Sequence, residues 1–152
     1  MPIVAYEMAY TRADVEESGI VCIPYEESRF QEYMGIYNAC FYDMRKALDI
    51  QPYNCLADTG QIAGKQKDIF LLVNESEIIG SVACCGNEID DLIVSQKYQR
   101  RGYGRQLLLW GMNHIRSYSH APITLHVAEW NESALRLYRE IGFEITRVER
   151  IR

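Results

Sequence analysis

The sequence predicts an α/β fold in which antiparallel strands come first and helices then alternate with strands. Two apolar runs, 69–73 and 78–85, flank the polar turn 74–76 and predict a hairpin of two central strands. A third run, 88–94, leads through a glycine-containing turn into an amphipathic helix. Strand patterns at 122–127 and 143–151 enclose one more helical pattern. This order of elements predicts helices packed on a sheet.

The first apolar runs lie near the start of the chain. Residues 3–10 alternate in the manner of a strand, and the polar run 11–19 predicts a turn. Residues 20–23 form a second short apolar run, which we expect Pro24 to stop.

A long helix is predicted next. Ser28 and Gln31 have the spacing of a capping box, and apolar side chains recur at helical spacing from residue 30 to residue 48. The polar, glycine-containing segment 55–67 fits either a short helix or a loop.

The turn before the second long helix predicts an anion-binding site. The first amides of a helix have no partner within the helix, the helix dipole adds positive charge there, and glycine lets a phosphate approach the backbone. In a chain with a formal net charge of -5, four cations gather at this turn: Lys97, Arg100, Arg101 and Arg105. The alternative is an exposed loop whose arginines are solvated.

Two motifs carry a resemblance to the GNAT N-acetyltransferase superfamily. The turn reads Gln99-x-x-Gly102-x-Gly104, which resembles the acetyl-coenzyme A signature Q/R-x-x-G-x-G/A of that family. The later string Val127-x-x-x-Asn131-x-x-Ala134-x-x-x-Tyr138-x-x-x-Gly142-Phe143 resembles its second conserved block. Together they cover about 69–143. The resemblance implies a mixed, mostly antiparallel twisted sheet with helices on both faces, and acetyl-CoA as the co-substrate.

The resemblance divides one domain, residues 1–152, into a substrate-side part (1–68) and an acetyl-CoA-binding core (69–152). It places the cofactor against the end of the third strand, the glycine turn and the start of the last helix. The residues expected to contact acetyl-CoA are Leu92, Ile93, Val94, Gln99, Arg100, Arg101, Gly102, Tyr103, Gly104, Arg105 and Asn131.

The second motif also makes physical sense as a helix. Asn131 suits the N-cap and Gly142 the C-terminal stop. On spacing alone, Tyr138 fits a core aromatic side chain with its hydroxyl at the rim of the core. The resemblance implies instead that Asn131 contacts the pantetheine arm and that Tyr138 stands near the sulfur, as the acid for the leaving thiolate.

The implied reaction is acetyl transfer from acetyl-CoA to a primary amine by direct attack in a ternary complex. An alkylammonium has a pKa of ~10.4, so little free amine is present at pH 7 and a general base is valuable. The thiol of the leaving group has a pKa of ~8.5 and needs less help. The alternative function is a catalytically weak acyl-CoA-binding module that serves in sensing or interaction.

The carboxylates at the start of the third strand, Glu88, Asp90 and Asp91, are the candidate bases. Glu88 lies eleven residues before Gln99, where several GNAT enzymes that acetylate lysine carry a glutamate base; the alternative is a solvated strand end. Asp90 shares the face of Glu88 by strict alternation, although the bulge usual in this strand of the family leaves the facing carboxylate open. His126 is a third candidate, or else a satisfied core residue.

The acceptor amine is expected between this strand and the long first helix. Tyr33 and Tyr37 are the candidate wall residues, with Tyr42 as a further one. The alternative is that these tyrosines belong only to the core.

Length and composition limit the kinds of protein and of binding partner that fit this sequence. At 152 residues and 48% hydrophobic, the chain fits one globular domain, and no apolar run reaches the ~18 residues of a membrane span. We therefore expect a soluble, cytoplasmic protein with no membrane partner. The acidic balance argues against nucleic acid and suits a cationic small-molecule or peptide amine. A homodimer is compatible with the sequence.

The sequence disfavours metal binding or catalysis by its cysteines, and it disfavours nucleotide binding by a P-loop. The five cysteines show no C-x-x-C and no histidine at metal spacing, so no metal site is predicted. Cys84 and Cys85 read as strand core rather than as a catalytic thiol. The chain has no G-x-x-x-x-G-K-[ST], which excludes a P-loop.

Overall fold

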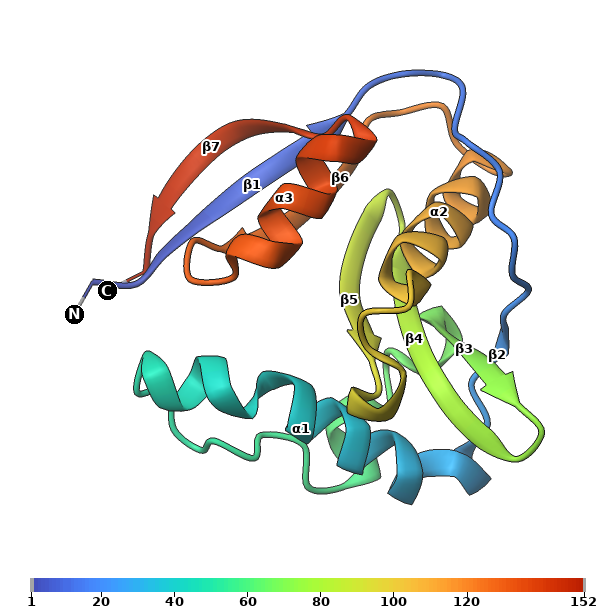
Figure 1. Ribbon diagram of the computed structural model, residues 1–152, viewed down its shortest axis with the longest axis vertical. Coiled ribbons are helices and arrows are strands. Elements are labelled where there is room, and N and C mark those ends of the chain that lie inside the picture. The colour runs from blue at the N-terminus through green and yellow to red at the C-terminus, as the bar shows by residue number, and fades with distance from the viewer. Residues whose placement is uncertain (1, 152) are drawn as a thin grey trace.

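A seven-stranded sheet runs through the protein. The structure, a computed structural model, describes residues 2–151. The strands lie in the order β2-β3-β4-β5-β6-β1-β7 (Figure 1). All neighbouring strands are antiparallel except β5 and β6, which confirms the predicted mixed, mostly antiparallel sheet. Their bounds are β1 Val4–Tyr10, β2 Ile23–Pro24, β3 Ile69–Asn74, β4 Glu77–Cys85, β5 Glu88–Val94, β6 Ile123–Ala128 and β7 Glu144–Arg150.

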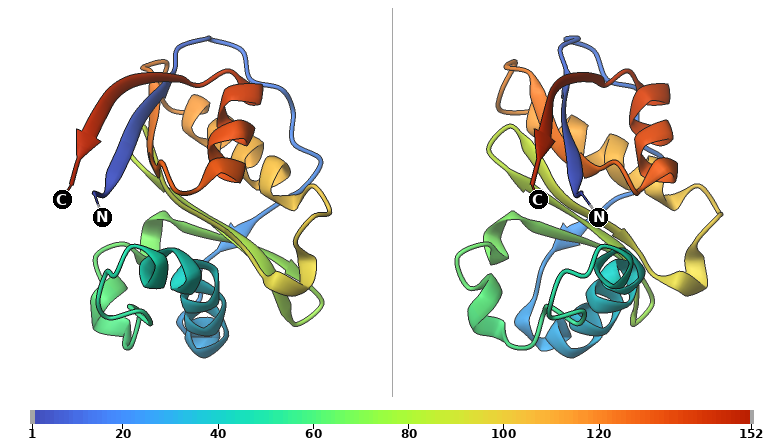
Figure 2. Two further views of the ribbon diagram at one scale, coloured as in Figure 1. Left: turned by 60° about the vertical axis from the view of Figure 1, so that its left-hand side comes forward. Right: turned by 90° about the vertical axis from the view of Figure 1, so that its left-hand side faces the viewer.

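Helices cover both faces of the sheet. Helix α1 (Phe30–Ala47) packs on one face of β3, β4 and β5, around Tyr33, Leu71 and Ile93. Helices α2 (Tyr103–Arg116) and α3 (Glu132–Ile141) pack on the other face. Both views in Figure 2 keep α1 and α2 on opposite sides of β4 and β5. None of the helices within residues 2–151 combines the length and apolar character that a membrane span requires.

Close packing of α2 on the sheet depends on Gly111. A side chain there would begin 2.9 Å from Val82 Cγ2 and 3.0 Å from Ile89 Cδ1. Helix α2 therefore lies against β4 and β5 at a distance that only glycine allows.

Strands β5 and β6 separate soon after they meet. Their pairing consists of Glu88 with Thr124 and Ile89 with Leu125. Beyond Ile89, β5 continues along β4 alone. The backbone edge of β5 that faces away from β4 is therefore available to a ligand over Leu92–Val94.

A bulge in β5 decides where its carboxylates point. Val82 pairs with Leu92 and Cys84 pairs with Ile89, so the single residue Ala83 lies opposite both Asp90 and Asp91. Ile89 and Leu92 pack toward α2, and the extra residue turns both aspartates to the α1 side. The expected bulge is confirmed, and it places the two adjacent carboxylates on one side.

Two local predictions in the first part of the chain are wrong. Pro24 does not stop the second apolar run; it forms β2 with Ile23 at the sheet edge, where the missing N–H of proline is tolerated. Ser28 is not a helix cap, because it lies inside the 3₁₀ turn Glu27–Arg29 and α1 has no side-chain cap.

The segment 55–67 is a loop with two short 3₁₀ turns, Thr59–Ile62 and Gln66–Asp68. Asn38 of α1 holds its start: the side-chain amide donates to Leu56 O at 2.8 Å, and the side-chain oxygen accepts from Leu56 N at 2.9 Å. The loop is thereby fixed next to the face of β5 that carries the aspartates.

Candidate active site

The glycine turn is built as a backbone cradle at the start of α2. Gly102 is the N-cap residue and has a φ of 85°, which glycine adopts without strain. Arg100 also has a positive φ, 65°. Gln99 closes the turn by donating its side-chain amide to Val94 O at 3.0 Å. The first amides of α2 then point outward, as an anion site requires.

A cavity of ≈ 530 Å³ opens beside this turn. It is lined by the end of β5, the glycine turn, the start of α3 and one side of α1. Every residue predicted to contact the cofactor lines it except Arg101 and Arg105. Arg101 lies over the Tyr98 ring, 5.6 Å from its centroid, and Arg105 pairs with Glu16 at 3.3 Å. Their roles at the cofactor remain predictions.

Several lining residues of this cavity were not predicted as site residues. Among them, Cys40 and Phe41 come from α1, and Trp130, which is 46% exposed, precedes Asn131. The position of this tryptophan directly before a predicted N-cap asparagine was a usable signal in the sequence. The α1 residues could not be assigned without knowing how that helix crosses β5.

Asn131 is the N-cap residue of α3, and Tyr138 lies near the C-terminal end of the same helix. Asn131 caps the helix, since its side-chain oxygen accepts from Ala134 N at 3.2 Å, and its amide group is not needed for that cap. Tyr138 packs at 6.0 Å from Phe143 between ring centroids and also lines the cavity. Burial, with a smaller contribution from Asp91, raises the pKa of Tyr138 to about 12. Its ring belongs to the core and to the cavity wall at once.

A second cavity, of ≈ 290 Å³, lies between α1 and β5. Tyr33 and Tyr37 line it from α1, and Asp90 and Asp91 line it from β5. The two tyrosine rings are 5.9 Å apart and continue to Phe41 of the first cavity. Tyr42 points elsewhere, to Tyr53. The tyrosines predicted to contact the acceptor and the carboxylates of β5 therefore line the same cavity.

Asp91 lies where β5 passes from the smaller cavity to the larger one. The Tyr37 hydroxyl donates to Asp91 Oδ2 at 3.4 Å, and the next residue, Leu92, lines the first cavity. Burial raises the pKa of Asp91 from 3.8 to about 6, the charge of Asp90 adds to this, and the Lys65 ammonium partly offsets it. Strict alternation along the strand favoured Asp90 as the carboxylate that faces the acceptor. The bulge turns Asp91 to the same side, so that both line the smaller cavity.

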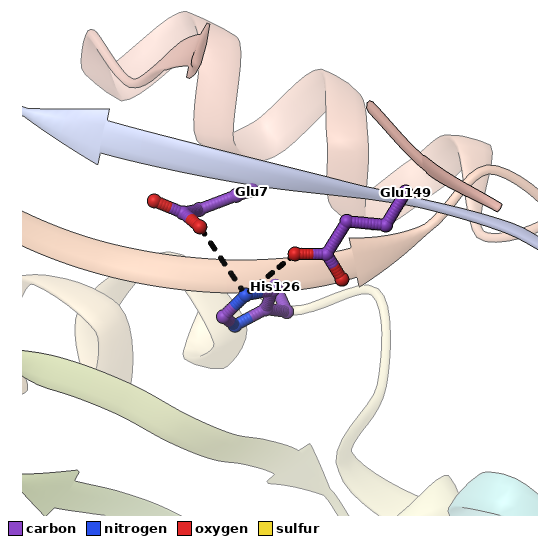
Figure 3. Close-up of side chains that lie close together, drawn as sticks. All are labelled: Glu7, His126 and Glu149. Atoms are coloured by element: carbon purple, nitrogen blue, oxygen red, sulfur yellow. Dashed lines mark ion pairs between the residues drawn. The ribbon is translucent and has the colours of Figure 1, made fainter. Parts of the chain in front are cut away.

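Glu88 lies on a different part of the surface, with His126. Its carboxylate is 3.7 Å from His126 Nδ1, and neither residue is among those lining the two cavities. Figure 3 shows the carboxylates of Glu7 and Glu149 directed at the same imidazole, with distances of 3.7 and 3.5 Å to its Nε2. Their roles as bases remain predictions.

The ligand atoms of Glu7, His126 and Glu149 lie within 4.8 Å of one another, close enough for a metal ion. However, the Arg147 guanidinium contacts both carboxylates, at 3.1 Å to Glu7 and 2.5 Å to Glu149. The local positive charge is thus already supplied by arginine, and we read the group as an ion-pair network.

Three cysteines border the cavities. Cys40 lines the larger one, donates to Val94 O at 3.1 Å, and has its pKa raised by burial. Cys55 and Cys85 line the smaller one. Cys84 is buried as predicted, whereas Cys85 is exposed, so reading Cys85 as strand core was wrong.

The family comparison agrees with the fold and with both motifs. The model described as "Acetyltransferase (GNAT) family" matches residues 27–143. Over 91 residues the chain is 34% identical to a mycothiol acetyltransferase from Thermobifida fusca. That match covers 57% of this chain and 26% of the relative, so the chain spans about a quarter of its length.

Solved structures share the fold at low identity. A GNAT-family acetyltransferase from Colwellia psychrerythraea superposes with a TM-score of 0.73 at 13% identity, covering 97% of this chain and 55% of that one. A GCN5-related N-acetyltransferase from Sphaerobacter thermophilus gives 0.69 at 18% identity, covering 99% and 52%. These structures support the architecture alone.

Proposed function

The chain belongs to the GNAT acetyltransferase family, and we propose that it transfers an acetyl group from acetyl-CoA to a primary amine bound between α1 and β5. The observation that carries this proposal is Asp91. It is a half-buried carboxylate with a raised pKa that lines the smaller cavity opposite Tyr37, directly before Leu92 of the larger cavity. Perturbed carboxylates in clefts are the usual candidates for acid–base work.

The larger cavity fits acetyl-CoA, which supplies the activated thioester. The amides at the start of α2 suit the pyrophosphate, and Arg100 adds positive charge. The edge of β5 without a neighbouring strand, at Leu92 and Ile93, offers backbone groups to the pantetheine amides, while Val94 O already accepts from Gln99 and Cys40. Tyr138 and Leu92 both line this cavity, and we place the thioester near them, beside the amine held at Asp91.

The smaller cavity fits the amine. An alkylammonium with a pKa of ~10.4 must lose its proton before attack, which costs about 4.6 kcal/mol at pH 7. Asp91 is ionised at that pH, yet it is more basic than an ordinary aspartate. It can hold the ammonium and then accept its proton, while Tyr33 and Tyr37 shape the apolar part of the site.

Tyr138 stabilises the leaving group as a hydrogen-bond donor. With a pKa of about 12 its phenol stays protonated at neutral pH. A thiolate whose conjugate acid has a pKa of ~8.5 is too weak a base to take that proton fully. The expected contribution of Tyr138 to the rate is therefore smaller than that of Asp91.

Direct transfer is favoured over a cysteine-bound acetyl group. Cys40 is the thiol at the larger cavity, but its proton is held by Val94 O and burial disfavours its thiolate. We expect intersecting initial-rate lines for the two substrates, and a Cys40→Ser variant that keeps most of its activity.

The test is release of free thiol from acetyl-CoA across a panel of amines. The panel contains alkylamines, amino acids, amino sugars and a lysine peptide, and it includes small molecules because the relative is named for mycothiol. Turnover with at least one amine, lost in Asp91→Asn, is expected. Tight acetyl-CoA binding with no turnover on any amine would instead favour an acyl-CoA-binding module.

A further inference from the structure

The geometry points to an internal occupant of the acceptor site: we propose that Lys65 holds the place of the acceptor ammonium and is acetylated by its own chain. This inference rests on the proposed function. It adds a modification site and a competitor for the acceptor.

Lys65 lies on the loop that borders the smaller cavity. Its backbone N–H donates to Ile62 O at 2.8 Å, which fixes the stem of the side chain. Its ammonium Nζ reaches β5, 3.6 Å from Asp90 Oδ2. Lys65, Asp90 and Asp91 all line the same cavity as Tyr33 and Tyr37. The lysine therefore spans the site from the loop to the bulged strand.

The group that Lys65 presents there is chemically the group that an acceptor would present. It is a primary alkylammonium beside a pair of carboxylates, and its charge is felt by Asp91. The remaining charged side chains that line the cavity are Asp68 and Arg45, and Arg45 donates to Pro52 O. An acceptor must displace the Lys65 ammonium to reach Asp90.

The ion pair is loose enough for Lys65 to move. Its side chain is 62% exposed and that of Asp90 31% exposed, and exposed pairs stabilise a structure little. A lysine carries four flexible methylenes. The ammonium can thus leave for solvent when an acceptor binds, or turn inward toward Asp91 when none is present.

The other three lysines serve as internal controls. Lys67 is two residues along the same loop, is exposed, and is not among the cavity-lining residues. Lys97 is held by both oxygens of Glu77 at 3.1 Å. Lys46 lies over the Tyr42 ring. Chemical acetylation by free acetyl-CoA would not single out Lys65 from these.

The step balances as an ordinary acetyl transfer. Asp91 takes a proton from the Lys65 ammonium, and the free Nζ forms a bond to the thioester carbonyl carbon. The carbon–sulfur bond breaks, and CoA leaves as the thiolate with the electron pair of that bond. The nitrogen then loses a second proton, which the thiolate takes to become the thiol. Lys65 becomes a neutral amide, so its ion pair with Asp90 is lost.

The first measurement is peptide mass spectrometry of the purified chain incubated with acetyl-CoA. Lys65 should be acetylated at least tenfold faster than Lys67. The rate constant should stay unchanged over a tenfold range of protein concentration, because the reaction is intramolecular, and a good acceptor should suppress it. Lys67→Arg should not change the result. Equal labelling of Lys65 and Lys67 would overturn the proposal.

The second measurement needs no turnover. Calorimetry with an amine acceptor and desulfo-CoA should give a severalfold lower Kd for Lys65→Gln, in which the competing charge is gone, and an unchanged Kd for Lys65→Arg and Lys67→Gln. An unchanged Kd for Lys65→Gln would contradict the occupancy. Turnover of external amines, together with an unmodified Lys65 when acetyl-CoA is supplied alone, would overturn self-acetylation and leave the proposed function standing. If neither external amines nor Lys65 were acetylated, the proposed function and self-acetylation would both be wrong.

Discussion

The two cavities are lined by neighbouring residues of β5, Asp91 and Leu92, yet they are built in different ways. The larger one includes a backbone cradle, made of helix amides, a glycine with positive φ and a strand edge without a neighbouring strand. The smaller one is made of side chains from α1, a loop and a strand bulge. A site built from backbone atoms can bind the same ligand even when its side chains change. We therefore assign acetyl-CoA to the larger cavity and the choice of acceptor amine to the smaller one.

The largest effect is expected in the half made of side chains. Asp91→Asn should lower turnover ~10²- to 10⁴-fold, the range for loss of a general base, with acetyl-CoA affinity nearly unchanged. Asp90→Asn is the matched control, one residue away on the same bulge, and should act mainly on the KM of the amine. Steady-state kinetics and calorimetry measure both. An equal loss of turnover in Asp91→Asn and Asp90→Asn would mean that the two aspartates act only through their negative charge.

A smaller loss should follow from filling the backbone cradle. A Cβ at Gly104 would lie 3.9 Å from Leu137 and Val94, which is ordinary contact, so Gly104→Ala should fold normally. Gly104→Val should raise the Kd for acetyl-CoA about 100-fold, or about 2.7 kcal/mol, because its methyl groups crowd the ligand side of the turn. Calorimetry on the folded variant tests this. An unchanged Kd would mean that the ligand does not use this turn.

Stability should separate the two halves again. The raised pKa of Asp91 means that its protonated form favours folding; this contribution is complete below pH 3.8 and is lost as pH rises through about 6. Asp91→Asn should therefore gain roughly 1–3 kcal/mol at pH 7 and almost nothing at pH 3.5. Urea unfolding at both pH values measures the difference. Gly102→Ala should lose ~1 kcal/mol at either pH, because its φ is 85°.

The smallest effect is expected for Tyr138. Its ring packs on Phe143 and survives in Tyr138→Phe, so both the fold and acetyl-CoA binding should be preserved. Turnover should fall less than tenfold, since the phenol only donates a hydrogen bond to a good leaving group. A loss as large as that of Asp91→Asn would make Tyr138 an equal partner in the reaction.

The same contrast explains what the sequence could predict. The strand, turn and helix from Glu88 to Arg116 follow from local periodicity and glycine positions, and their bounds agree closely with the structure. The start and stop of α3 at Asn131 and Gly142 were equally local. Most residues of the cofactor half fall in two short segments, 92–104 and 130–138, so these could be assembled from motifs, unlike the residues that α1 contributes.

The acceptor half depends on contacts that no local pattern contains. The bulge that turns Asp91 beside Asp90 arises from pairing with β4, which period-2 alternation does not predict. The position of Lys65 depends on Asn38 of α1 holding a loop with no periodicity of its own. Cys40 faces Val94 only because α1 crosses β5 there.

The pH dependence of kcat/KM tests the central assignment most directly. With Asp91 as the base, activity should fall about tenfold per pH unit below an apparent pKa of about 6. Asp91→Asn should abolish that acid limb, and Glu88→Gln, whose carboxylate faces His126, should retain it. An acid limb near pH 6 that persists in Asp91→Asn and disappears in Glu88→Gln would contradict the account and assign the base to Glu88, where β5 pairs with β6.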